Sequence, residues 1–224
     1  TDTELQGIDL NLGVVLWQSG ERDAARKAYQ AAFRESGSRQ ILFNNIGNIY
    51  FLDGQYRKAL GAYRKAREAG PTSETVLYNL AQTCIALGKT REAAAYLEEV
   101  LSVSPSRLDV LEMLSGIAER LGDPARAEIY YGRTLDVSPG NEAALAGLTR
   151  VLCAQDRCRE AIDYIEAFLD RMPNSKRIRQ LLGDTYNGME WYEVAQMKFE
   201  ELLRDFPDDP SALMGLGRSL LGVA

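Results

Sequence analysis

Asparagines gather in one short stretch of the chain and recur at a fixed distance on either side of it. Residues 43–52 read FNNIGNIYFL, with three asparagines in six positions. The asparagines of interest are Asn11, Asn44, Asn45, Asn48 and Asn79. Of these, Asn11 and Asn79 lie 34 residues before and after Asn45. Asparagine is a poor helix former, so three in one helix forfeit roughly 1–2 kcal/mol of propensity relative to alanine. A side-chain amide both donates and accepts hydrogen bonds, which suits the backbone of an extended peptide.

Residues that usually support catalysis or metal binding are scarce. The 224 residues include no histidine, which removes the commonest general base near neutral pH and the commonest zinc ligand. Cys84, Cys153 and Cys158 are odd in number and lack a CxxC spacing. We therefore expect neither a disulfide framework nor a metal site, and we interpret the three cysteines as small buried apolar residues. Without a phosphate-binding glycine loop or a convergent pair of carboxylates, we predict that the chain is not an enzyme and binds no cofactor or metal.

The composition narrows the class of partner. Hydrophobic residues make up 46% of the chain, which is ample for a core. The 26 Lys and Arg against 32 Asp and Glu give a net charge of −6, which argues against nucleic-acid binding. No apolar run approaches the roughly 18 residues of a membrane span. Because the sequence begins at Thr1 without methionine, we expect an excerpt or a removed N-terminal segment. The location is then cytoplasmic, or periplasmic or secreted if a signal was removed.

The asparagine spacing belongs to an internal repeat with a period of 34 residues. A large aliphatic residue followed by a small one recurs at this period, as in Leu12-Gly13, Ile46-Gly47 and Leu216-Gly217. A second column is always alanine: Ala25, Ala59, Ala93, Ala127, Ala161 and Ala195. A third column is glycine in the first four repeats and changes in the last two: Gly20, Gly54, Gly88, Gly122, Asp156 and Glu190. A proline closes most of the repeats.

These columns predict a series of helical hairpins. Small residues let two antiparallel helices approach closely, glycine suits the left-handed position that ends a helix, and proline cannot continue one. In the segment GDPARA, Asp123 is expected as an N-cap and Pro124 as the first helical residue. In the fifth repeat Asp156 stands where the first four repeats have the turn glycine, so we expect a looser turn there.

The pattern resembles that of the tetratricopeptide repeat family over nearly the whole chain. The second repeat matches best, through Phe43, Ile46, Gly47, Tyr50, Gly54, Tyr56, Ala59, Tyr63, Ala66 and Pro71. The resemblance implies an all-α fold, a right-handed α-solenoid (superhelix) of antiparallel helix hairpins. We predict a single domain over residues 1–224. Its six full repeats and terminal helix are expected at 6–39, 40–73, 74–107, 108–141, 142–175, 176–209 and 210–224.

The resemblance also implies where a ligand would bind, because first helices line a concave groove in this family. The residues expected in the groove are Asn11, Trp17, Asn44, Asn45, Asn48, Phe51, Tyr78, Asn79 and Gln82. Asn11, Asn45 and Asn79 would form a ladder similar to the asparagine ladder of O-linked N-acetylglucosamine transferases. Trp17, Phe51 and Tyr78 would add apolar contact area. Asparagine is also common at these positions throughout the family, so inherited consensus is the competing interpretation.

We interpret the chain as a protein–protein interaction scaffold that binds an extended peptide or a partner helix in its groove. An alternative is an assembly scaffold that self-associates or bridges subunits through its C-terminal end and convex face. Leu213, Leu216 and Leu220 repeat the core spacing, so the last helix is expected to cover the sixth repeat. Its far side would then be uncovered, and we name these three leucines as the possible self-association residues of a homo-oligomer. A further alternative is the repeat region of a larger enzyme. The expected partner is a protein or peptide.

Overall fold

The structure is a computed structural model. It describes residues 38–71 and 73–223, together with residues 13, 15, 16, 19–21, 23–25, 27, 28 and 31 near the N-terminus. The helices from Arg39 onward are α3 (Arg39–Leu52), α4 (Tyr56–Glu68), α5 (Glu74–Ala86), α6 (Thr90–Val103), α7 (Leu108–Arg120), α8 (Pro124–Val137), α9 (Glu142–Cys153), α10 (Cys158–Arg171), α11 (Lys176–Gly188), α12 (Tyr192–Asp205) and α13 (Pro210–Val223). Internal contacts divide the chain into two compact units, Thr1–Pro105 and Ser106–Ala224.

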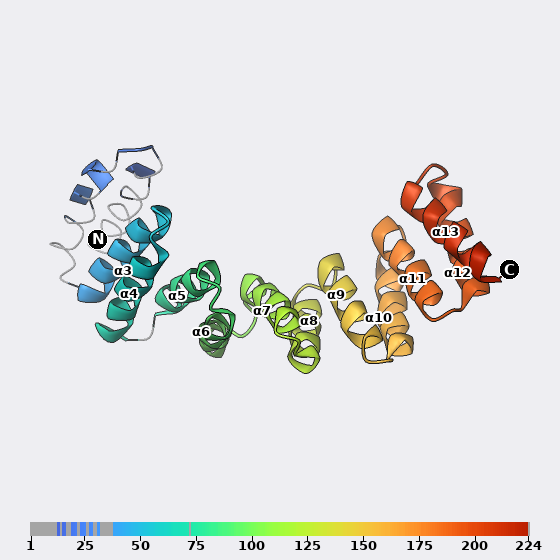
Figure 1. Cartoon of the computed structure of the whole chain (residues 1–224), viewed down its shortest axis with the longest axis horizontal. Coiled ribbons are helices and arrows are strands. Elements are labelled where there is room, and N and C mark those ends of the chain that lie inside the picture. Colours follow the sequence, from blue (N-terminus) through green and yellow to red (C-terminus); the bar gives the residue numbers. More distant parts are fainter. Residues whose placement is uncertain are drawn as a thin grey trace. The chain divides into compact units, whose positions relative to one another are not determined.

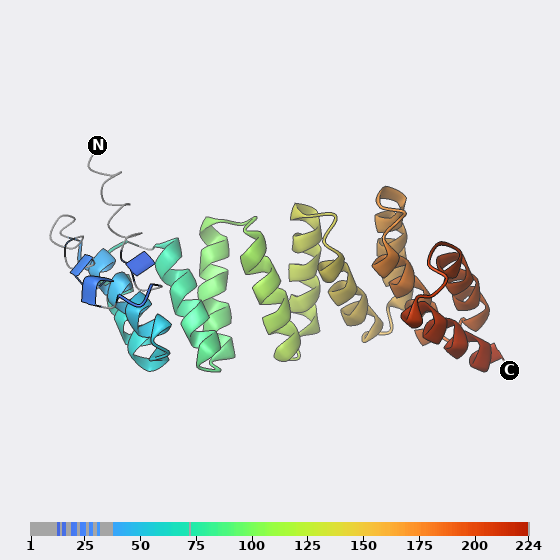
Figure 2. The same ribbon diagram turned by 90° about the horizontal axis from the view of Figure 1, so that it is seen from above.

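Consecutive helices pair as antiparallel hairpins, as the two views in Figure 1 and Figure 2 show. In the first unit these are α3–α4 and α5–α6, and α4 packs on α5. In the second unit they are α7–α8, α9–α10 and α11–α12, and α13 lies against both α11 and α12. The part of the chain that the structure describes contains no strand. The predicted all-helical fold of antiparallel hairpins is confirmed.

Small residues hold the two helices of each hairpin together, as the sequence columns predict. All six alanines of the alanine column have 0% exposure: Ala25, Ala59, Ala93, Ala127, Ala161 and Ala195. A Cβ atom at Gly47 would overlap the ring of Tyr63 on the facing helix. A Cβ atom at Gly183 would lie 2.7 Å from Cζ of Phe199. Aromatic rings on the second helices therefore occupy the space that the small residues leave, which gives the interior its close packing.

The residue in the turn column has a left-handed backbone conformation in every repeat, including the two repeats that lack glycine there. The backbone φ is +72° at Gly88, +60° at Asp156 and +62° at Glu190. In the α9–α10 turn, the N–H of Arg157 donates to the carbonyl of Leu152 at 2.9 Å. Arg157 lies four residues beyond Cys153, the last residue of α9, and its bond satisfies a carbonyl of the last helical turn in the way a glycine turn does. The expectation of a looser turn in the fifth repeat is therefore wrong.

Two of the three cysteines flank this α9–α10 turn, and their state differs from the prediction. Cys153 ends α9, Cys158 begins α10, and a disulfide joins them. The interpretation of all three cysteines as buried apolar residues is wrong for this pair, because the turn brings its two flanking residues together. Cys84 is free and buried, as expected.

Helix starts follow the capping rules. The Asp123 carboxylate accepts the Arg126 backbone N–H at 3.1 Å, and Pro124 is the first residue of α8, as predicted. The Asn141 side chain caps α9 in the same way, by accepting the N–H of Ala144 at 2.9 Å. These caps set where each hairpin begins.

The terminal helix α13 turns its small residues, rather than its leucines, toward the preceding repeat. Its buried residues are Ala212, Gly215 and Ser219. The Phe199 ring fills the space beside Gly215, so a larger side chain does not fit there. Leu216 packs partly against this core, whereas Leu213 and Leu220 are 49% and 50% exposed. Of the three leucines predicted for a self-association surface, Leu213 and Leu220 are thus exposed to solvent, whereas Leu216 lies partly in the core.

Candidate functional site

The predicted site residues that the structure brings together lie on α3 and α5 of the first unit. Asn44 and Asn48 are one helical turn apart, so they share a face of α3. The side-chain amide of Asn79 on α5 donates to Oδ1 of Asn44 at 3.0 Å and to Oδ1 of Asn48 at 3.3 Å. We call Asn44, Asn48 and Asn79 the asparagine cluster. All three side chains are half-buried.

A buried tyrosine anchors the asparagine cluster to the hairpin core. The Tyr63 hydroxyl on α4 donates to Oδ1 of Asn48 at 2.8 Å, and the Tyr63 side chain is buried beneath it. Asn48 Oδ1 therefore accepts two hydrogen bonds and its orientation is set. In the sequence, Tyr63 is recognised only as one of the residues of the repeat pattern. Its hydroxyl group was the signal for the hydrogen bond to Asn48, since a buried tyrosine usually finds a hydrogen-bond partner.

The cluster leaves specific hydrogen-bonding atoms unused. Asn79 has two amide hydrogens, and both are accounted for by Asn44 and Asn48. Within the described residues, Oδ1 of Asn79 and the amide nitrogens of Asn44 and Asn48 make no hydrogen bond. One acceptor and two amide donors thus lie together on half-buried side chains. This arrangement matches the acceptor and donor pattern of a peptide backbone.

Asn45 does not belong to the cluster, contrary to the prediction that it faces the groove. Its side chain is 1% exposed, and among the residues that the structure describes neither of its amide atoms has a hydrogen-bond partner. Asn79, in the equivalent position one repeat later, bonds residues 35 and 31 positions earlier in the chain. The two repeats therefore differ at this position: the Asn79 amide is hydrogen-bonded, and the Asn45 amide is buried without a partner among the described residues.

The other predicted groove residues fall into three groups. Tyr78 and Gln82 are half-buried on α5, beside Asn79 in sequence. Phe51 packs edge-on against Tyr56 across the α3–α4 turn, with ring centroids 5.2 Å apart. Asn11 and Trp17 lie outside the described residues.

In the second unit, the equivalent surface is charged and internally paired. Arg150 on α9 donates two hydrogen bonds to the carboxylate of Glu119 on α7, at 2.9 and 2.8 Å. The Tyr131 hydroxyl donates to the same carboxylate at 2.7 Å. The bonds from Arg150 hold the pKa of Glu119 below its usual value, against the opposing effect of burial. Burial, with the nearby Glu119 carboxylate, raises the pKa of Tyr131 to about 12. These side chains join one hairpin to the next.

A hollow of about 470 Å³ lies between α11 and α13 in the second unit, and Asp184, Arg218 and Leu221 contribute to its lining. Burial raises the pKa of Asp184, and the guanidinium of Arg218, 3.6 Å away, opposes this shift. Asn187 bridges the two helices by donating to the carbonyl of Gly215 at 3.0 Å and accepting from the Ser219 hydroxyl at 2.9 Å. Its amide therefore has a structural role.

The comparisons with known proteins agree with this hairpin architecture. Four family models described as tetratricopeptide repeat match the chain, and together they cover residues 10–222. Their matched segments are 10–37, 38–106, 78–142, 118–185 and 182–222. No curated protein matches the chain in sequence. None of the helices in the described ranges has the length and hydropathy of a membrane span.

Solved structures resemble the chain in fold at low sequence identity. PilF of Pseudomonas aeruginosa is 19% identical, with 95% of this chain and 97% of that chain covered and a TM-score of 0.62. The C-terminal part of a repeat protein from Cytophaga hutchinsonii is 18% identical, with coverage of 94% and 87% and a TM-score of 0.70. YrrB, described as "a TPR protein with an unusual peptide-binding site", is 18% identical, with coverage of 76% and 88% and a TM-score of 0.59. The repeat columns, the hairpins they build and the family matches lead to one conclusion: the chain belongs to the tetratricopeptide repeat family.

Proposed function

We propose that this chain is a protein-interaction scaffold that holds an extended peptide along α3 and α5, with the asparagine cluster gripping the peptide backbone. The observation that supports this most directly is the set of hydrogen-bonding atoms that the cluster leaves unused. Asn79 Oδ1 accepts a peptide N–H, and the amide nitrogen of Asn44 donates to a peptide carbonyl. Half-buried Tyr78 and Gln82 lie on the same helix as Asn79 and add contact area.

The internal bonds of the cluster favour binding because they fix the side chains in advance. Tyr63 orients Asn48, and Asn48 together with Asn44 orients Asn79. A ligand then orders few rotamers on binding, which reduces the entropic penalty of association. Recognition of a peptide backbone by side-chain amides does not depend on the peptide's side chains. We therefore expect the chain to bind peptides in an extended conformation with only a modest preference for their sequence. YrrB, which has a similar fold, is described as having a peptide-binding site, and this fits the proposal.

A displayed library of random linear peptides tests the proposal. Peptides selected on the wild-type chain are expected to bind the double variant Asn44→Ala, Asn79→Ala roughly 10- to 100-fold more weakly, because two hydrogen bonds are lost. Asn174→Ala, which removes an exposed amide from the second unit, serves as the matched control and should leave affinity unchanged. Thermal melts establish that the variants are folded. Selected peptides that bind the folded double variant at wild-type strength would exclude the asparagine cluster as the site.

The exposed apolar residues of α13 favour a second candidate function, self-association as an assembly scaffold. Leu213, Leu220 and Leu221 are all exposed, and Leu221 reaches 81%. An apolar surface of this kind is typical of a protein contact. Light scattering over a range of concentrations should then show an oligomer that Leu220→Glu with Leu221→Glu converts to a monomer. Val103→Glu, at an exposed apolar residue of α6, is the control. A wild-type chain that stays monomeric at high concentration would remove this candidate.

A further inference from the structure

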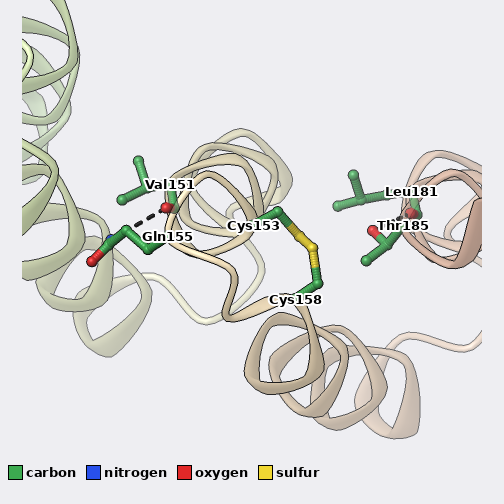
Figure 3. Close-up of a disulfide and its surroundings, with 6 residues drawn as sticks. All are labelled: Val151, Cys153, Gln155, Cys158, Leu181 and Thr185. Atoms are coloured by element: carbon green, nitrogen blue, oxygen red, sulfur yellow. Dashed lines mark hydrogen bonds between the residues drawn. A yellow bond between two sulfur atoms is a disulfide. The ribbon is translucent and has the colours of Figure 1, made fainter. Parts of the chain in front are cut away.

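The disulfide between Cys153 and Cys158 closes the turn between α9 and α10 (Figure 3). Both cysteines are half-buried, so solvent reaches this part of the hairpin. The bond lies on the side of the hairpin that faces α11, where the figure shows Leu181 and Thr185.

The hairpin brings these two positions together whether or not they are cysteines. In the second repeat the same two positions hold Phe51 and Tyr56, whose rings are in edge-to-face contact at 5.2 Å. The turn at Asp156 has the left-handed conformation found at Gly88, where no disulfide is present. Backbone hydrogen bonding therefore sets the turn, and the fold places the two sulfur atoms side by side. The hairpin should keep its shape when the bond is open.

The third cysteine, Cys84, is poorly placed to exchange with the disulfide between Cys153 and Cys158. Cys84 lies in the core of the first unit with 0% exposure. Burial raises the pKa of its thiol to about 11, so little of the reactive thiolate forms near neutral pH. Thiol–disulfide exchange requires a thiolate and access to a sulfur atom. Exchange chemistry in the folded chain is therefore confined to Cys153 and Cys158.

We propose that Cys153 and Cys158 are a reversible redox pair, which a small dithiol opens in the folded protein and an oxidant closes again. One thiolate of the dithiol attacks a sulfur of the pair, giving a mixed disulfide and releasing the other cysteine as a thiolate that takes up a proton. The second thiol of the reductant then displaces the first cysteine. Two electrons and two protons pass to the pair, which becomes two thiols, and the reductant becomes a cyclic disulfide.

Counting thiols tests the proposal directly on the wild-type chain. After treatment with oxidised glutathione and removal of the reagent, the denatured protein should show one free thiol, that of Cys84. After dithiothreitol treatment without denaturant and removal of the reductant, the still-folded protein should show two reactive thiols, and denaturation should reveal a third. Cys84→Ala is the control that lowers each denatured count by one. Three thiols in the oxidised denatured protein, or no thiols opened without denaturant, would overturn the proposal.

Thermal melts supply a second measurement. Opening a cross-link that spans so short a loop should lower the melting temperature of the wild type by roughly 3 to 6 °C. Circular dichroism should show the helical content retained at temperatures below the melt. The variant Cys153→Ser, Cys158→Ser should melt at the same temperature with and without dithiothreitol. A wild type whose melting temperature does not respond to the reductant argues against the pair even if that variant fails to fold.

Discussion

The backbone N–H of Arg157 donates to the carbonyl of Leu152 at 2.9 Å across a turn that contains no glycine. The residue in the left-handed position is Asp156, and Glu190 occupies the equivalent position one repeat later, with φ near +60° at both. A residue with a Cβ atom is strained in this conformation, by roughly 1–2 kcal/mol for most types. The two hairpins keep the turn geometry of the family because the backbone hydrogen bonds of the turn and the packing of the helices together outweigh this strain.

The first prediction follows from this strain. Replacing Glu190 by glycine removes the Cβ clash, although glycine also has more freedom in the unfolded chain. We expect Glu190→Gly to raise the free energy of unfolding by about 0.5–1 kcal/mol, measured by urea denaturation. Gly88 occupies the equivalent turn position. Gly88→Ala introduces a Cβ atom there and should lower the free energy of unfolding by about 1 kcal/mol. A destabilised Glu190→Gly variant would show that the glutamate side chain makes a contact that outweighs the strain.

Two glycines of the α3–α4 hairpin should respond in opposite ways to the same substitution. A methyl group at Gly47 would meet the ring of buried Tyr63, whereas nothing lies within 4 Å of the corresponding position at Gly61. We expect Gly47→Ala to lower the free energy of unfolding by about 1–3 kcal/mol through overpacking. Gly61→Ala should raise it by about 0.5–1 kcal/mol, because alanine is the better helix former. Denaturation of both variants side by side checks the prediction, and equal effects would contradict it.

Asp184 should destabilise the fold at neutral pH. Burial raises its pKa above the ordinary value of 3.8, so its contribution to stability is fully present below that value and lost as pH rises through the folded pKa. Arg218 is largely exposed and compensates little. Asp184→Asn should therefore melt at a higher temperature than the wild type at pH 7, with the difference disappearing near pH 3. Asp163→Asn, at an exposed carboxylate of α10, controls for net charge. A lower melting temperature for Asp184→Asn at pH 7 would refute the argument.

Arg150 should control the titration of Glu119. Its two hydrogen bonds are the main cause of the lowered Glu119 pKa, so Arg150→Ala should move that pKa up toward the ordinary 4.5. The stability linked to this depressed pKa is present above 4.5 and lost as pH falls through the folded value. Side-chain carbon NMR during a pH titration measures the shift. Arg120→Ala removes an exposed guanidinium beside Glu119 in sequence and should leave the titration unchanged. An unmoved Glu119 pKa in Arg150→Ala would assign the effect to Tyr131 instead.

The hairpins could be predicted from the sequence because each column of the repeat encodes a local requirement. The alanines mark where helices touch, and the turn column marks where the chain reverses, so the two kinds of column agree on the same boundaries. The fifth-repeat turn was mispredicted because residue type was taken to decide its conformation. At Asp156 the hydrogen bond to Leu152 and the packed helices decide it instead.

The candidate site was only partly predictable. Asn44, Asn48 and Asn79 could be identified from their spacing and chemistry, but the burial of Asn45 could not. Asn45 and Asn79 occupy the same repeat position, so the repeat spacing alone could not distinguish the buried amide from the hydrogen-bonded one. The disulfide was missed for a related reason, because its two cysteines are five residues apart along the chain and become neighbours only when the turn forms.

The hairpin arrangement also determines how far the unfolding caused by one substitution extends along the chain. In the first unit α4 packs on α5, and in the second unit α8 packs on α9 and α10 on α11, so each hairpin depends mainly on its immediate neighbours. Stability in such an array is a sum of local terms and junction terms. A substitution at Gly183 should therefore unravel the hairpins around α11 while those around α7 stay folded. Hydrogen exchange would then show faster exchange of backbone amides only in the hairpins next to the substitution. The other hairpins of the unit would keep their protection.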